Sequence, residues 1–140
     1  MKAPRRLPRL RDPQQAAHHL ADIVNPRFYA RHTLLVVLCG PGSEPTHHLE
    51  VVECPDDPTP SSCADVLDNI LTMVLDDPAT SPTTGLALAI TRPGSEQVQP
   101  LDRVWFRALH RVCHTRGLLA HGVYVVGSHG ARAIHIDDAA

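Results

Sequence analysis

The chain has 140 residues, a length that suits one domain and is too short for two separate hydrophobic cores. Hydrophobic residues make up 43% of it and aromatic residues only 4%, so we expect an aliphatic core and no aromatic surface that stacks nucleic-acid bases. The formal net charge is -2, yet Lys2, Arg5, Arg6, Arg9 and Arg11 concentrate positive charge at the N-terminus.

We expect residues 1–11 to be a frayed, solvated basic tail and residues 12–140 to form one domain. The alternative is that this tail is an arm for nucleic acid or another polyanion. No stretch approaches the roughly 20 apolar residues of a membrane span, and polar residues follow the basic start where a signal peptide has its apolar core. We therefore expect a soluble, cytoplasmic protein. Its abundant Arg, Ala and Pro indicate a GC-rich bacterial genome.

The first elements follow from turn and cap residues. Asp12 and Pro13 predict the start of a helix that Asn25-Pro26 ends. The apolar run 33–39, the turn residues 40–43 and the run 47–53 predict a β-hairpin. The proline-rich segment 54–60 cannot continue the strand. After it, a capping box formed by Ser62 and Asp65 predicts a second helix that reaches about residue 76.

The second half of the chain also contains runs that predict strands and a helix. The run 86–90 is apolar throughout, which is typical of a strand that is covered on both faces. Apolar residues at helical spacing, including Trp105, predict a helix that ends at Gly117. The runs 122–126 and 131–136 predict a closing hairpin around 128–130. The order α-β-β-α-β-α-β-β predicts a single three-layer α/β (α+β) domain with a mixed β-sheet and flanking helices.

Residues 88–134 carry a family resemblance. The strand ending in Leu88-Ala-Ile-Thr-Arg-Pro93 precedes a polar loop, Asp102 then opens a helix that Gly117 ends, and Tyr124-Val-Val-Gly127 follows. This pattern resembles the RadC branch of the JAB/MPN family, which shares its fold with metal-dependent deubiquitinating and related isopeptidases. The resemblance implies a JAB/MPN architecture, which is cytidine-deaminase-like.

The two zinc-binding histidines of that family fall on Ile90 and Arg92, and only Pro93 and the third ligand position, Asp102, remain. Ile90 cannot bind zinc and Arg92 repels it, whereas zinc catalysis needs two neutral imidazoles and a carboxylate. The expected general base is also missing, because run 33–39 contains no acid, and Glu50 and Glu53 are weak substitutes. We expect no metal, no cofactor and no catalytic residue of the family's kind.

Two interpretations of the former metal position remain open. Arg92 pairs with the carboxylate of Asp102 where zinc would have been bound, or Arg92 is exposed to solvent and Asp102 only caps its helix. The zinc motifs of cytidine deaminases, His-x-Glu and Pro-Cys-x-x-Cys, are absent from the sequence.

Other candidates lie on the helix that contains Trp105. His110 and His114 have the one-turn spacing of a two-point metal site, and Cys113 lies three residues after His110, but we expect solvated or structural roles for them. Arg103, Arg107 and Arg111 recur every four residues and form either a solvated face or a contact for a partner's acids or for phosphate.

These features favour a non-catalytic, RadC-like protein-interaction or scaffold module with an unknown protein partner and a possible homodimer. One alternative is a metal-dependent hydrolase with a relocated site that uses His110, His114 or Asp102. The other is a nucleic-acid-associated protein that uses its Arg-rich tail and helix.

Overall fold

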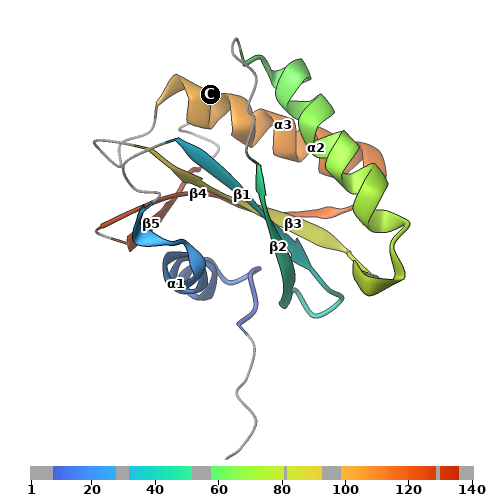
Figure 1. Cartoon of the computed structure of the whole chain (residues 1–140), viewed down its shortest axis with the longest axis horizontal. Helices are drawn as coiled ribbons and strands as arrows, with labels where there is room; N and C mark the ends of the chain where they lie inside the picture. The colour runs from blue at the N-terminus through green and yellow to red at the C-terminus, as the bar shows by residue number, and fades with distance from the viewer. Residues whose placement is uncertain are drawn as a thin grey trace, which may run out of the picture.

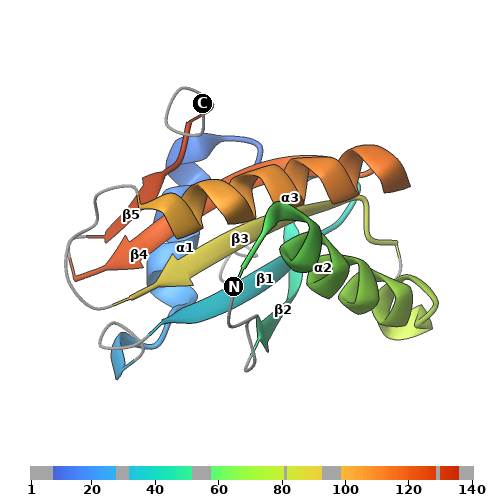
Figure 2. The same cartoon turned by 90° about the horizontal axis from the view of Figure 1, so that it is seen from above.

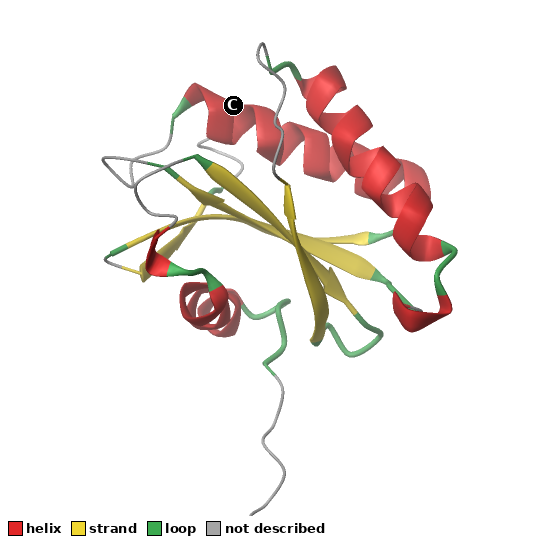
Figure 3. Cartoon of the chain, in the orientation of Figure 1, coloured by secondary structure: helices red, strands yellow, loops and turns green. Residues whose placement is uncertain are grey.

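A computed structural model describes residues 8–27, 32–51, 58–80, 82–92, 99–128 and 130–135. Figures 1 and 3 show a β-sheet with helices on both faces. The helices are α1 (Pro13–Ile23), α2 (Pro60–Leu75), the 3-10 helix η2 (Pro78–Thr80) and α3 (Pro100–Arg116). The strands are β1 (Thr33–Cys39), β2 (Pro45–Val51), β3 (Gly85–Thr91), β4 (Leu119–Gly127) and β5 (Gly130–Ala133). The predicted order of elements is confirmed.

The five strands form one mixed sheet in the order β2-β1-β3-β4-β5. β1 pairs antiparallel with β2 and β3, β3 pairs parallel with β4, and β4 pairs antiparallel with β5. Both predicted hairpins are therefore confirmed, although β2 begins two residues earlier than expected, and residues 52 and 53, its expected end, lie outside the described residues. Every residue of β3 is buried, as the unbroken apolar run predicts for a strand covered on both faces.

Figure 2 shows α2 and α3 lying side by side over one face of the sheet, with α1 on the opposite face. Side chains alternate between the two faces along each strand, so the sheet takes part in two cores. Leu34, Val36, Leu88 and Ile90 pack beneath α2 and α3, whereas Leu35, Val37, Ala87 and Ala89 face α1. The result is the expected three-layer arrangement.

The predicted cap of α2 is wrong by three residues. The N-cap is Thr59, whose hydroxyl accepts a hydrogen bond from the Ser62 N–H at 3.1 Å, while the Ser62 hydroxyl accepts one from the Thr59 N–H at 2.9 Å. Pro60 occupies the first helical turn, where its fixed φ suits the helix and its missing N–H costs nothing. The capping box therefore joins Thr59 and Ser62 rather than Ser62 and Asp65.

The boundary expected at residue 12 is also too late. Leu10 is fully buried in the core on the α1 side, and its N–H donates to the carbonyl of Ser43 at 2.8 Å. The packed domain therefore begins before residue 12, and an apolar side chain inside the basic segment was the available signal. Lys2, Arg5 and Arg6 lie outside the described residues. Among the described residues, no helix has the length and apolarity to cross a membrane.

Candidate functional site

The position at which the family resemblance expects zinc lies at the end of β3 and the start of α3. Thr33 pairs with Thr91 across β1 and β3, so residues 32, 34, 90 and 92 share the face that α2 and α3 cover. Arg92 follows β3 directly on this face, and its side chain is only 6% exposed. Its guanidinium Nη1 lies 2.5 Å from Oδ1 of Asp102, a carboxylate that is itself 1% exposed.

Asp102 has two functions at once. Its Oδ1 accepts from Arg92, while its Oδ2 accepts a hydrogen bond from the Gln99 backbone N–H at 2.7 Å, which caps the start of α3. The predicted pairing of Arg92 with Asp102 is therefore confirmed, and so is the capping function of Asp102. The expectation that Arg92 is exposed to solvent is wrong, because the carboxylate beside it compensates the cost of burying the guanidinium.

His32 is a third polar group at this position, one that the sequence analysis missed. It lies immediately before β1, on the strand that pairs with β3. Desolvation lowers the pKa of His32, the charge of Asp102 acts to raise it, and the charge of Arg92 acts to lower it further. Only the antiparallel register of β1 and β3 brings His32 to Arg92, and no local motif indicates that pairing.

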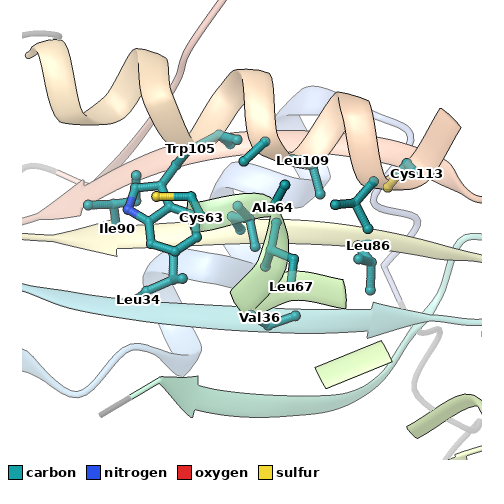
Figure 4. Close-up of a cluster of buried hydrophobic side chains, with 14 of the residues drawn as sticks. Leu34, Val36, Cys63, Ala64, Leu67, Leu86, Ile90, Trp105, Leu109 and Cys113 are labelled. Atoms are coloured by element: carbon teal, nitrogen blue, oxygen red, sulfur yellow. The ribbon is translucent and has the colours of Figure 1, made fainter. Parts of the chain in front are cut away.

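Ile90, where the resemblance expects another zinc ligand, belongs to the core. Its side chain is fully buried, and Figure 4 shows it beside the ring of Trp105, with Cys63 and Leu34 close by. A zinc ion does not fit these residues, because position 90 supplies no donor atom and position 92 places a cation against the remaining carboxylate. The residues present form a closed ion pair at the edge of an apolar core.

Glu50, a weak substitute for the general base, does not lie at this position. Glu50 pairs with Leu35 across β2 and β1, and Leu35 faces α1, so Glu50 is on the opposite face of the sheet from Asp102. Glu53 and Pro93 lie outside the described residues. A carboxylate behind the sheet cannot accept a proton from a group held beside Arg92.

His110 and His114 are both exposed on α3, in agreement with the expected edge or surface position. The ring of His110 lies against that of Phe106 with centroids 4.4 Å apart and planes tilted by 41°, and desolvation lowers the pKa of His110. Cys113 is buried, in contrast to the two exposed histidines, and its thiol donates to the carbonyl of Leu119 at 3.8 Å. Within the described part of the chain, no three His, Cys, Asp or Glu side chains are placed to hold a metal ion.

The arginine row of α3 consists of Arg103, Arg107 and Arg111, and all three residues are exposed. The Nη1 of Arg111 donates to the hydroxyl of Ser61 at 3.2 Å, which brings the row to the start of α2. The three arginines are therefore exposed to solvent, as their recurrence every four residues along the helix predicted.

Comparisons of the chain with protein-family models, with curated proteins and with solved structures find no match.

Proposed function

We propose that this domain is a JAB/MPN-like scaffold without metal chemistry that acts through contacts with a protein partner. The observation that supports this proposal best is the buried ion pair of Arg92 and Asp102. It occupies the position at which the family resemblance expects zinc, and it uses the only ligand residue that remains. The order of elements in the mixed sheet is compatible with that architecture.

The arginine row is the surface that we assign to the partner. Three exposed guanidinium groups one turn apart present a line of donors suited to carboxylates on another protein. Interfaces use arginine more than lysine because its planar group is weakly hydrated and binds two acceptor atoms at once. An acidic protein surface is therefore the expected partner.

The scaffold part of the proposal is tested by rebuilding the metal site. The variant Ile90→His/Arg92→His places two imidazoles on the face of Asp102, and we expect it to bind one Zn²⁺ per chain in equilibrium dialysis with metal analysis. The same variant with Asp102→Asn added serves as the matched control and loses that metal. Stoichiometric, tightly bound zinc in the wild-type protein contradicts the proposal, and so does a rebuilt site that binds no zinc while the protein remains folded.

The interaction part is tested by affinity purification from the source cells, followed by reconstitution with the purified partner. We expect an acidic protein to bind the wild type and to be lost with Arg103→Ala/Arg107→Ala/Arg111→Ala. Arg27→Ala, an exposed arginine next to α1 on the other face, is the control. Binding of DNA with a steep salt dependence that the same triple variant abolishes instead supports nucleic-acid association.

A further inference from the structure

The face of the sheet that carries α1 contains a pocket that the proposed scaffold function does not use. α1 makes most of its contacts with β4 and β5, so an open space remains between the end of the helix and part of β1 and β2. The space between them is a pocket of about 380 Å³. That volume lies within the range of sites that take up small molecules.

The floor of the pocket is one row of paired residues across the sheet. Glu50, Leu35 and Ala89 pair in sequence on β2, β1 and β3, so their side chains lie side by side. Leu35 and Ala89 are buried and apolar, and Ile23 and Val24 of the helix end form an apolar wall. Because Ala89 has only a methyl group, it leaves room at the β3 end of this row.

Polar groups stand at defined places around this apolar floor. Thr33 and Thr91 pair across β1 and β3 at one end of the pocket and are only 5% and 2% exposed. His48 and Glu50 line the side formed by β2. A small number of polar groups around an apolar surface is the usual composition of a small-molecule site.

The charge of the pocket identifies the class of ligand. Glu50 is the only carboxylate among the described lining residues, which include no lysine or arginine. Within the described part of the chain, no cation pairs with Glu50, and its side chain is exposed at the pocket. We propose that this pocket binds a small primary amine with an apolar body, with the ammonium group on Glu50 and the body over Leu35 and Ala89.

The test is a titration of the full chain followed by amide chemical shifts in ¹⁵N-labelled protein. The probes are 2-phenylethylamine and two compounds of similar size, the neutral 2-phenylethanol and the anionic phenylacetate. We expect the amine to shift the amides of Leu35, Glu50 and Ala89 saturably, with an affinity about tenfold above that of the alcohol. The indole of Trp105, on the other face, should not respond.

Two variants separate the contribution of the charge from that of the floor. Glu50→Gln should reduce the affinity for the amine to that for the alcohol, and Asp65→Asn, which removes a carboxylate from α2, should leave it unchanged. Ala89→Val fills the floor and should weaken both the amine and the alcohol. Equal affinities for all three probes, no saturable shift in the wild type, or an unaltered affinity in Glu50→Gln each overturn the proposal. None of these outcomes bears on the metal or partner experiments above.

Discussion

Arg92 and Asp102 are ten residues apart in the sequence, and they form an ion pair in which both side chains are almost completely buried. One comes from the end of a central strand and the other from the first turn of a helix, so the pair fixes α3 to the sheet. Buried pairs of this kind add little net stability, but breaking them is costly because one charge is left without its partner.

We therefore expect Asp102→Asn to lower the free energy of unfolding by about 3 kcal/mol. The asparagine keeps an oxygen for the Gln99 N–H, so the loss reports the charge rather than the helix cap. Urea denaturation measures it, with the exposed Asp65→Asn as control. The double variant Arg92→Met/Asp102→Asn should cost less than the two single variants added together. A strictly additive double variant would show that the two side chains do not interact.

A second prediction concerns His121, which lies at the irregularity where β4 has one more residue than β3. Its Nε2 is buried and has no hydrogen-bond partner among the described residues, and desolvation lowers the pKa of His121 from its ordinary value. The unfolded chain then binds more protons than the folded one, so protonation favours unfolding and stability falls as the pH drops below about 6.5. We expect His121→Gln to reduce this fall in urea denaturation between pH 7.5 and pH 5. A variant with the full wild-type pH dependence rules out this contribution.

The thiols provide a third prediction. Burial raises the pKa of both Cys39 and Cys113 to about 12, with the charge of Glu44 adding to the effect at Cys39. Cys63 is fully buried as well. Cys54, the fourth cysteine, lies outside the described residues, so the test uses the variant Cys54→Ser, which keeps the other three. Because only the thiolate attacks a disulfide, we expect no reaction of the folded variant with Ellman's reagent at pH 8, and three reactive thiols in urea. Rapid labelling of the folded protein contradicts the buried positions.

A fourth prediction concerns the attachment of α3 to α2. Arg116 donates through Nε to Oδ1 of Asp68 at 2.6 Å and through Nη2 to the hydroxyl of Thr72 at 2.8 Å. Since both charged groups are partly exposed, solvent weakens the pair, and we expect Arg116→Ala to cost about 1 kcal/mol in thermal or urea unfolding. Arg103→Ala, at the other end of the same helix, is the control and should be close to neutral. Equal losses in the two variants would contradict a specific contribution from the contacts of Arg116, because alanine itself favours the helix.

Most of the fold could be predicted because its signals are local. Asp12 and Pro13 mark the start of α1, Gly117 in the left-handed conformation at φ 68° ends α3, and the apolar run around Leu88 marks the central strand. The cap of α2 was misplaced because Thr59-Pro60 and Ser62-Asp65 are both good starts. Thr59-Pro60 prevails because proline suits the first helical turn, where its φ matches the helix and its missing N–H needs no partner.

The candidate site was predictable only in part. Arg92 and Asp102 could be paired because the family resemblance aligned them, but the burial of Arg92 depends on how α3 packs on β3. His32 reaches this position through the register of β1 and β3, which no residue near His32 encodes. The pocket beside Glu50 depends on where α1 lies over the sheet, and the amphipathic pattern of a helix does not determine that placement.

The complete burial of Ile90 beside Trp105 has a consequence for how this sequence can change over generations. A histidine at position 90 alone would put an unsatisfied imidazole into an apolar environment, and a histidine at position 92 alone would leave Asp102 without its cation. Each first mutation toward a metal site lowers stability and supplies no complete ligand set. Selection for folding therefore opposes the acquisition of a zinc site at these positions by single mutations.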